Sequence, residues 1–390
     1  MITRKLVAAA LGLCMIISVF SQEEEKPETT FKYGGFVKAD YLFTQYNYGS
    51  YEGPGREFHI PSTIPKGEEQ DVYRFTDFNV RTSRFNFDVN TTVNGKKLRS
   101  FLELDFMIND IGNQRVSNSY VPRIRHFFLE YGNLLAGQTW TTFMIVTLPD
   151  ELDFIGATEG VVFNRQMMVR YAANGWQVAL ENPYVTYSAD STGARLTSET
   201  SYLPDLVVRR DFKGDWGNFS VAAIGRQLSY YDADKTLQSA FGGGVTLGGK
   251  LKVGSKDDIR FEGTFGAGLG RYLALNFVNS SAVDSEGKMK PISTFNGYLA
   301  YLHHWNDKFR SSFSFSFFQA SNDIEVAGPN VNDQAYSISG NLLYQPAKNV
   351  LFGVEPSYAY AENAGGVGGD YFRVQFTAKY AFSFKTSTGN

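Results

Sequence analysis

The sequence of 390 residues predicts an all-β fold, a transmembrane antiparallel β-barrel of about 16 strands with one loop folded inward. Three observations carry this prediction. Apolar and polar side chains alternate with a period of two along many segments, aromatic residues make up 15 % of the chain, and short turns alternate with long polar loops. After the first two dozen residues, no run approaches the roughly 20 apolar residues that a spanning helix needs.

The first segment, residues 1–21, has the pattern of a secretory signal peptide. Arg4 and Lys5 form its charged start, an apolar run follows, and small residues precede the expected cleavage site. A short acidic leader, expected to be disordered, covers residues 22–30. The single cysteine, Cys14, lies within the expected signal, so the mature chain would have neither disulfides nor a thiolate metal ligand. An exported chain of this kind fits the envelope of a diderm (Gram-negative) bacterium.

The strand periodicity is clearest near the C-terminus. Between Phe309 and Gln319, Phe residues alternate with Ser and Arg, and the same pattern runs from 370 to 384. Successive side chains of a strand point to opposite faces, so each such stretch has one apolar and one polar face. Tight turns such as Asn94-Gly95 separate the segments. We expect strands near 31–44, 77–90, 97–108, 121–131, 133–141, 161–172, 174–187, 203–213, 217–230, 237–252, 257–273, 292–305, 308–320, 333–345, 349–361 and 370–384.

The length of these strands points to a membrane. A tilted strand crosses a bilayer in roughly 9–11 residues, whereas strands of soluble sandwiches have roughly five or six. Aromatic residues gather at strand ends, for example Tyr41 and Phe43, as in the interfacial girdles of outer-membrane barrels. A secreted or periplasmic β-sandwich is the alternative. We expect the barrel domain to span residues 31–384, followed by a polar tail over 385–390, and a barrel of this size encloses an aqueous lumen, which indicates a pore.

The stretch 142–160 is too apolar for a loop that is bathed in solvent. We expect it to fold into the lumen as a constriction loop, where Leu148, Leu152 and Phe154 pack on the wall while acidic side chains face the channel. The alternative is an exposed loop held against a neighbouring protomer. The residues expected to shape the constriction are Pro149, Asp150, Asp153, Phe154 and Glu159.

Basic side chains on the polar strand faces are the candidates for solute contact. Guanidinium groups offer two parallel hydrogen bonds to a carboxylate or a phosphate, and weak serial sites let an anion pass without trapping it. The alternative for each is pairing with a wall carboxylate such as Asp88, Glu103 or Asp105. The net charge of −3 by itself suggests a cation pore, but charges on outer loops are screened and charges in a narrow lumen are not. The candidates are Lys38, Arg84, Lys97, Arg99, Arg123, Arg125, Arg165, Arg170, Arg260 and Arg373.

Several other classes of function are disfavoured. With 37 basic and 40 acidic residues, the chain does not resemble a nucleic-acid-binding protein. The adjacent His303 and His304 face opposite ways on a strand and cannot chelate one metal together, so we expect no metal and no cofactor. A lipase-type dyad would need one of these histidines beside Ser312 or Ser314, and the serine alternation already explains those serines. We therefore expect no enzyme activity.

A resemblance to a known family emerges around the expected constriction loop. The segment Gly-Gln-Thr-Trp-Thr-Thr-Phe at 137–143, with Pro149 and Leu-Asp-Phe at 152–154, resembles the signature of porins related to DcaP. Further matching pieces lie at 35–41, 83–87, 103–106, 123–126, 165–166 and 170–171. The resemblance covers roughly residues 31–175. Two features depart from the family pattern, namely the missing N-terminal coiled-coil segment and the six residues after the terminal aromatic Phe384.

The resemblance implies a trimeric outer-membrane channel for small organic anions. We expect a passive diffusion channel for small hydrophilic solutes that prefers organic anions such as dicarboxylates. A phosphate or pyrophosphate porin and a non-conducting structural barrel of an envelope complex are the alternatives. The expected partners are outer-membrane lipid, the barrel-assembly machinery during biogenesis and two further copies in a homotrimer, for which the glycine-rich stretch near 240–270 offers a smooth contact wall.

Overall fold

The structure, a computed structural model, describes residues 28–107, 116 and 119–388. The expected signal peptide and most of the acidic leader lie outside the described residues. The wall is built from β1 (Thr29–Tyr46), β2 (Tyr73–Asn79), β3 (Arg84–Val93), β4 (Lys96–Asp105), β5 (Arg123–Tyr131), β6 (Leu134–Trp140), β7 (Arg165–Ala173), β8 (Trp176–Glu181), β11 (Asp205–Gly214), β12 (Gly217–Tyr231), β13 (Leu237–Val253), β14 (Asp257–Ala267), β17 (Ser293–His304), β18 (Phe309–Ser321), β19 (Asn332–Gly340), β20 (Leu342–Ala347), β21 (Val350–Asn363) and β22 (Gly368–Thr388).

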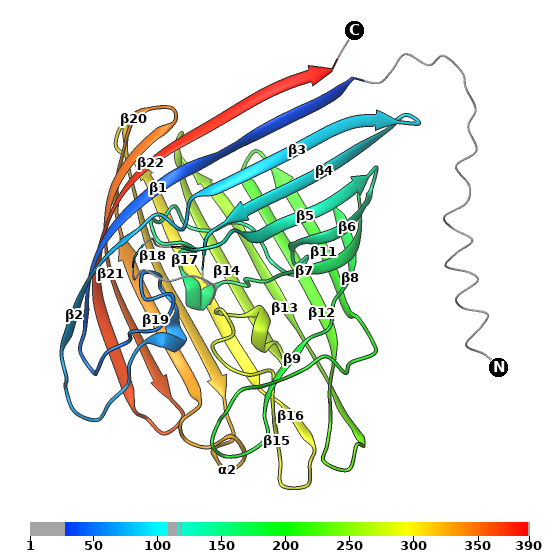
Figure 1. Ribbon diagram of the computed structural model, residues 1–390, viewed down its shortest axis with the longest axis vertical. Helices are drawn as coiled ribbons and strands as arrows, with labels where there is room; N and C mark the ends of the chain where they lie inside the picture. The colour runs from blue at the N-terminus through cyan, green and yellow to red at the C-terminus, as the bar shows by residue number, and fades with distance from the viewer. Residues whose placement is uncertain (1–27, 108–115, 117–118, 389–390) are drawn as a thin grey trace.

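These segments form a closed antiparallel barrel of 16 strands, which confirms the predicted fold (Figure 1). β2 and β3 together form one expected strand, and β19 and β20 form another, which reconciles the 18 segments of the sheet with 16 strands. The barrel closes because β1 pairs with β22 along its whole length, while its other edge pairs first with β3 and then with β2.

The two rims of the barrel differ in the length of their connections. At the rim that we call the turn rim, Asn94-Gly95 has φ angles of 49° and 71°, and Asn174-Gly175 has 51° and 78°. Positive φ at both positions is the requirement of a type I′ hairpin turn, and Asn-Gly meets it at low cost. The opposite rim, the loop rim, carries the long connections. They contain α2 (Ile324–Ala327) and a second sheet of β9 (Val185–Ser188), β10 (Leu196–Ser198), β15 (Ser281–Val283) and β16 (Met289–Pro291).

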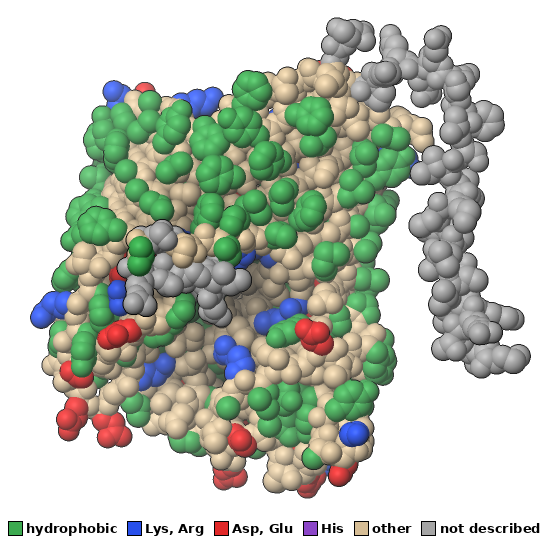
Figure 2. Space-filling model, in the orientation of Figure 1, with side chains coloured by type: hydrophobic (Ala, Val, Ile, Leu, Met, Phe, Trp, Pro, Cys, Tyr) green, Lys and Arg blue, Asp and Glu red, His purple; other side chains and the backbone are tan. Residues whose placement is uncertain are grey.

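The outer face of the wall is apolar, as the alternation predicts. In β18, Phe313 is 56 % exposed and points outward, whereas its neighbours Ser312 and Ser314 are 2 % and 3 % exposed and point into the barrel. Figure 2 shows apolar side chains spread over the wall in this view. No helix among the described residues is long and apolar enough to cross a membrane.

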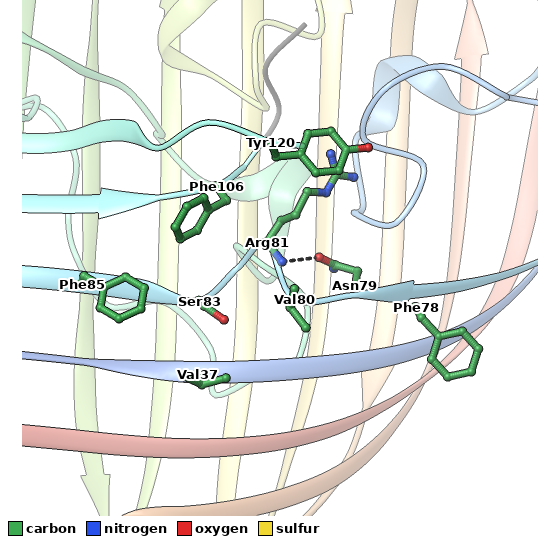
Figure 3. A pocket seen from close by; sticks show the side chains of 9 residues that line it. All are labelled: Val37, Phe78, Asn79, Val80, Arg81, Ser83, Phe85, Phe106 and Tyr120. Atoms are coloured by element: carbon green, nitrogen blue, oxygen red, sulfur yellow. Dashed lines mark hydrogen bonds between the residues drawn. The ribbon is translucent and has the colours of Figure 1, made fainter. Parts of the chain in front are cut away.

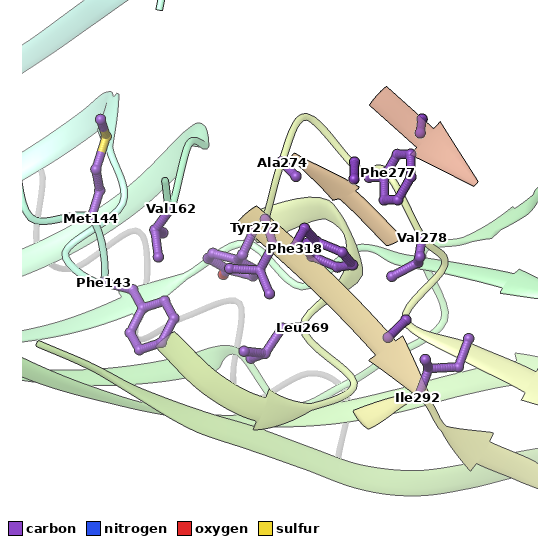
Figure 4. Packing of buried hydrophobic residues seen from close by; sticks show 14 of the residues in the cluster. Phe143, Met144, Val162, Leu269, Tyr272, Ala274, Phe277, Val278, Ile292 and Phe318 are labelled. Carbon is purple, nitrogen blue, oxygen red and sulfur yellow. The ribbon is translucent and has the colours of Figure 1, made fainter. Parts of the chain in front are cut away.

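The inside of the barrel is partly filled by a hydrophobic core. Three segments from the loop rim fold into the barrel and form this core, namely the first loop (residues 47–72), the constriction loop (141–164) and the sixth loop (268–292). They carry the short helices η2 (Pro61–Thr63), η3 (Thr158–Gly160) and η4 (Gly270–Tyr272). Figure 4 shows Phe143, Leu269, Phe277 and Phe318 packed together there. The core lies against the inward alanines of β8, β12, β18, β19 and β21, so this side of the lumen is occupied by protein.

Two predicted strands end earlier than expected. The strand expected at 257–273 ends at Ala267, because Gly268 takes a φ of 76° and the chain then turns into the lumen to form η4. The strand expected at 174–187 leaves the wall after Glu181. Its last part forms β9 in the second sheet.

The glycines of β13 and β14 serve packing inside the barrel. A Cβ on Gly244 or Gly266 would lie 2.9 or 2.8 Å from the Leu269 side chain, and the Gly266 Cβ would lie 2.5 Å from the Gly243 carbonyl oxygen. Leu269 is 0 % exposed and belongs to the core in the lumen. Gly244 and Gly266 therefore make room for the core inside the barrel, and the expected barrel-to-barrel contact at 240–270 stays a prediction.

Candidate functional site

The constriction loop lies inside the barrel, as the sequence predicts, and the wall holds its tip through backbone groups. The backbone amides of Leu152 and Asp153 donate to the Glu355 carboxylate of β21 at 2.8 and 3.2 Å. The Asn341 side-chain amide, between β19 and β20, donates to the carbonyl oxygen of Asp150 at 2.7 Å and to Glu355 at 2.8 Å. Backbone groups buried in the lumen need such partners because water does not reach them.

Four wall cations also bind the constriction loop. Lys38 Nζ donates to the Leu152 carbonyl oxygen at 2.6 Å and to Asp40 at 2.9 Å. Arg260 donates to the Leu148 carbonyl at 2.7 Å and pairs with Asp258 at 2.6 Å. Arg209 donates to the Met144 carbonyl and Arg310 to the Asp150 carboxylate, at 2.6 and 2.7 Å. Lys38 and Arg260, expected at the channel surface, therefore hold the loop in place.

Glu159 does not face the channel, contrary to the expectation from the sequence. It is 0 % exposed and accepts hydrogen bonds from Ser316 and Ser337 of β18 and β19. His59 of the first loop lies on its other side, with Nε2 2.5 Å from a Glu159 oxygen. The His59 ring also lies 2.6 Å from the Tyr371 hydroxyl. Glu159 is therefore the anchor between the first loop, the constriction loop and the wall.

The contact between His59 and Glu159 is a buried ion pair that joins the first loop to the constriction loop. Burial lowers the pKa of His59, but the Glu159 carboxylate outweighs burial and the pKa of His59 is raised from its ordinary value. Burial raises the pKa of Glu159, but His59, Ser316 and Ser337 outweigh it, and the pKa of Glu159 is lowered. Both shifts favour the ion pair.

The other residues of the constriction loop lie as follows. Pro149 and Leu152 are buried, and the Asp153 carboxylate accepts from the His59 amide at 3.1 Å and lies 3.5 Å from Arg373. Arg373 is 1 % exposed and also donates to a first-loop carbonyl, so it is a structural cation. Phe154 lies against the wall, where its ring centroid is 5.6 Å from the Arg84 and 5.4 Å from the Arg125 guanidinium carbon.

Three of the expected channel cations are neutralised by wall carboxylates. Arg99 pairs with Asp88 at 2.9 Å and Glu130 at 3.3 Å. Arg123 and Arg125 share the fully buried Asp105 at 2.9 and 2.8 Å, and Arg125 also pairs with Glu103. The sequence leaves open whether these arginines meet solute or wall, and the geometry assigns their charge to the wall.

Arg84 and Arg165 have no carboxylate within 4.0 Å among the described residues. Arg84, at the start of β3, lies over the rings of Phe36 and Phe154 at 5.3 and 5.6 Å, and its Nε has no hydrogen-bond partner. Arg165, at the start of β7, lies over Trp140 at 4.6 Å, and one of its terminal nitrogens is likewise unpartnered. Both are half-buried, and the rings below Arg165, Trp140 and Phe163, pack against the hydrophobic core. In the view of Figure 2, lysine and arginine side chains surround a hollow in the middle of the face.

Arg170 and Lys97, the two remaining candidates, also lack an ion pair within the described part of the chain. Arg170 is half-buried in β7, and Lys97 is exposed beside the Asn94-Gly95 turn at the turn rim. Lys97 therefore lies at the mouth of the lumen, away from the constriction loop.

Sequence reasoning missed the first and sixth loops as parts of the lumen. The signal that identified the constriction loop, an apolar run between strands, also marks residues 272–278 of the sixth loop (Tyr-Leu-Ala-Leu-Asn-Phe-Val). The first loop has no such apolar run. It is held in the lumen by the ion pair of His59 with Glu159 and by two separate buried side chains, Phe58 and Ile64, which are 4 % and 2 % exposed.

The histidines and serines considered for metal binding or catalysis have other partners. Ser314 bonds Glu151 and Ser339 inside the lumen, whereas His303 bonds Asp257 on the outer face at 2.7 Å. The described residues contain no group of three or more histidine, cysteine or acidic residues suited to a metal ion.

Comparison with known proteins identifies a family and several solved structures with the same fold. A family model described as DcaP outer membrane protein matches residues 27–382. The crystal structure of the outer membrane channel DcaP of Acinetobacter baumannii superposes with a TM-score of 0.73 at 21 % identity, covering 94 % of this chain and 100 % of that one. An anion-selective porin from Comamonas acidovorans (TM-score 0.52, 11 % identity, 91 % and 100 % covered) and Salmonella typhi OmpF in complex with daunomycin (0.51, 11 %, 89 % and 97 %) share the fold. No curated protein matches in sequence.

Proposed function

Because the chain belongs to the DcaP outer membrane protein family, it is a porin of the Gram-negative outer membrane, and we propose that it is a passive diffusion channel preferring small organic anions such as dicarboxylates. The observation that carries the preference is a pair of arginines without a carboxylate partner beside the constriction loop, Arg84 over Phe154 and Arg165 over Phe163. The neighbouring Arg123 and Arg125 share their charge with Asp105 and Glu103.

The physical reason is the local balance of charge beside the constriction loop. Arg123 and Arg125 together face Asp105 and Glu103, so their pairs add little net field. Arg84 and Arg165 add two positive charges without acidic partners, in a lumen where water screens poorly. An anion passing the constriction loop replaces the missing partner, and the guanidinium fork fits a carboxylate. The dicarboxylate class rests on the presence of two such charges and on the family resemblance.

A second candidate, a non-conducting structural barrel, is favoured by the filled half of the lumen. The hydrophobic core of the first, constriction and sixth loops lies against β8 to β21 and reaches Tyr46 of β1 and Tyr371 of β22. If the passage that remains were too narrow for solutes, the arginines would serve only the wall. Ion conductance separates the two candidates directly.

The test is the reversal potential of the reconstituted protein under a KCl gradient in a planar bilayer. We expect a shift toward the chloride potential, within the limit of about 59 mV per tenfold gradient for a monovalent ion. Arg84→Gln with Arg165→Gln should move the potential toward potassium, and it leaves no carboxylate without its partner. The control, Arg210→Gln with Lys213→Gln, removes the same charge near the turn rim, from one half-buried and one exposed position.

Three outcomes contradict parts of the proposal. A barrel without ion conductance supports the structural candidate. A potassium preference in the unchanged protein refutes the anion preference. Competition by succinate that is weaker than competition by phosphate or pyrophosphate replaces the dicarboxylate class with the phosphate alternative. Arg123 and Arg125 are unsuitable for this test, because their removal would leave the buried Asp105 unpaired.

We also propose that the porin functions as a homotrimer in outer-membrane lipid and reaches the membrane through the barrel-assembly machinery. The trimer rests on the family resemblance. The insertion signal would be the aromatic end of β22, where Tyr380 and Phe384 are 51 % and 58 % exposed on the outer face.

A further inference from the structure

A pocket lies on the outer face of the wall between β17 and β18, beside the turn that joins these strands at the turn rim. Its volume is about 390 Å³, and it is lined by Tyr301, His303, Trp305, Ser311, Ser312 and Phe313. Trp305 and Phe313 are 62 % and 56 % exposed, so the pocket opens away from the lumen. It therefore faces whatever surrounds the barrel in the membrane.

The pocket has a polar end toward the turn and an apolar end toward the middle of the wall. Trp305 Nε1 donates to Ser311 Oγ at 2.9 Å, and the Ser311 hydroxyl hydrogen has no acceptor within the described part of the chain. On the side away from the turn, Phe313 is followed along the outer face by Phe315, which lies opposite Leu299. Leu299 and Phe315 are 57 % and 43 % exposed, so they extend the apolar surface beyond the pocket.

Asp257, the first residue of β14, fixes the shape of the pocket before any ligand binds. Its carboxylate accepts from the Tyr301 hydroxyl and from the His304 amide, both at 2.8 Å, and lies 2.7 Å from His303 Nδ1. Because an ionised carboxylate only accepts, Nδ1 carries the hydrogen of that contact, and Nε2 of His303 is left for a ligand. The His303 ring also packs edge-on against Trp305, with ring centroids 4.4 Å apart. A preformed pocket loses little conformational entropy when it is filled.

The turn beside the polar end carries a positive charge that no acidic side chain of the described residues balances. Lys308 is exposed and has no carboxylate within 4.0 Å among these residues. Its backbone amide donates to the Asn306 side chain at 2.9 Å within the turn. The neighbouring Asp307 is paired with Lys256 of the β13–β14 turn at 2.6 Å. The polar end therefore offers a hydroxyl hydrogen and an ammonium group, which are the donors that an anionic oxygen accepts.

The position of the pocket at the turn rim decides which part of a lipid reaches it. The short turns of an outer-membrane barrel face the periplasm, where the leaflet consists of phospholipids. Trp176 and Trp216 lie near other turns of the same rim, 53 % and 47 % exposed, and together with Trp305 they mark the level of the headgroups. A phosphate is therefore present at the depth of the polar end, and acyl chains are present at the depth of Phe313.

A larger pocket on the wall, of about 640 Å³ between β2 and β3, does not offer this combination (Figure 3). Phe85 and Phe106, which line it, lie where the β3–β4 hairpin is furthest from its turn. Its cation, Arg81, is directed toward Tyr120, with the guanidinium carbon 4.3 Å from the ring centroid. A headgroup of the periplasmic leaflet does not reach this depth, so size alone does not make a headgroup site.

We propose that the β17–β18 pocket binds one phospholipid of the periplasmic leaflet through its headgroup. The phosphate accepts from the Ser311 hydroxyl and lies beside the Lys308 ammonium, and an acyl chain extends over Phe313. Trp305 holds the Ser311 oxygen, so the hydroxyl hydrogen is left for the phosphate. This site is independent of the pore, because it depends on the outer-membrane location and not on the solute that passes the lumen.

Photo-labelling of the unchanged protein locates the lipid. The probe is a phosphatidylethanolamine that carries a diazirine near the carbonyl end of one acyl chain, mixed into vesicles that hold the reconstituted barrel. After irradiation and digestion, we expect labelled peptides from residues 299–315 to exceed those from residues 212–219 by about tenfold, since a bound lipid stays longer than a passing one. Equal labelling around Trp305 and Trp216 would mean that lipid only surrounds the barrel, and it would overturn the proposal.

A matched pair of variants tests the polar contacts. Native mass spectrometry measures how much phosphatidylethanolamine each protein retains as the lipid is diluted in detergent. Trp305→Phe with Lys308→Gln removes the ammonium and the group that holds Ser311, so we expect half-occupancy to need about tenfold more lipid, the effect of one charge-assisted hydrogen bond. Trp216→Phe with Lys213→Gln makes the same replacements at the turn after β11 and should leave retention unchanged. Ser311→Ala is the smaller change and should act in the same direction as the first variant.

Two further results would refute the site. Equal lipid retention by the two double variants would show that Trp305 and Lys308 make no specific contact with lipid. A neighbouring copy that covers the pocket would keep the photo-label from residues 299–315, and the trimer of Trp305→Phe with Lys308→Gln would then dissociate in SDS at a lower temperature than the wild type. The substituted side chains lie on the outer face or in turns, so heat-dependent mobility on a gel should show a folded barrel in every variant, and the photo-label needs no variant.

Discussion

Removing the Glu355 carboxylate should release the constriction loop. Glu355 is 3 % exposed and accepts from the amides of Leu152 and Asp153 at the loop tip, so Glu355→Ala leaves two buried donors without partners. An unsatisfied buried donor costs about 1–3 kcal/mol, so the loss amounts to about 2–6 kcal/mol. At 1.4 kcal/mol for each tenfold change, the population of the released loop rises about 30-fold at the low end. Lys38 still holds the Leu152 carbonyl, so the release should be intermittent.

Single-channel recording and proteolysis report this release. In Glu355→Ala we expect added current noise with a larger mean conductance, and faster cleavage within residues 141–164 from the loop-rim side. Glu355→Gln keeps an acceptor oxygen and should restore most of the protection. Glu362→Ala is the matched control, because it removes the same charge from the same strand at a residue that contacts Tyr360 instead of the loop. An unchanged current trace and cleavage rate in folded Glu355→Ala would refute this account of the anchor.

Two further predictions concern buried charge. The stability that protonated His59 contributes to the ion pair is fully present below the ordinary histidine pKa of about 6.5 and is lost as pH rises through the raised pKa of His59. The stability that ionised Glu159 contributes is lost as pH falls through the lowered pKa of Glu159. His59→Gln should therefore abolish the alkaline increase in cleavage of the first loop, and a wild-type cleavage rate that is flat from neutral to alkaline pH contradicts this. Asp205→Ala should cost about 3–5 kcal/mol of unfolding free energy, because Arg226 at 3.0 Å and 0 % side-chain exposure loses its carboxylate, and Tyr272 loses an acceptor at 2.8 Å. The temperature at which the barrel unfolds, followed by its mobility on a gel, measures the loss. Equal unfolding temperatures for variant and wild type would show that the Asp205–Arg226 pair contributes nothing to stability.

The sequence determines the barrel because its signals are local. Side chains with period two, tight turns such as Asn94-Gly95 and the aromatic strand ends each follow from the geometry of a few neighbouring residues, and together they give the 16 strands that the structure contains. The apolar stretch 142–160 also belongs to this class, since a loop of that composition needs a surface to cover. Its place in the lumen was therefore predictable.

Only the tertiary structure decides which charges remain free. The alternation does not distinguish Arg84 from Arg123 and Arg125, because it places all three on the polar faces of the first strands. The carboxylate that cancels the charge of Arg123 and Arg125 comes from the neighbouring strand β4, at a register set by the bulge between β4 and β5. The same holds for Glu159. From its charge alone we expect it in the channel, but it is buried against the wall, where it pairs with His59, 100 residues earlier in the chain. Such pairings depend on distances between segments far apart in sequence, and periodicity within one strand holds no information about them.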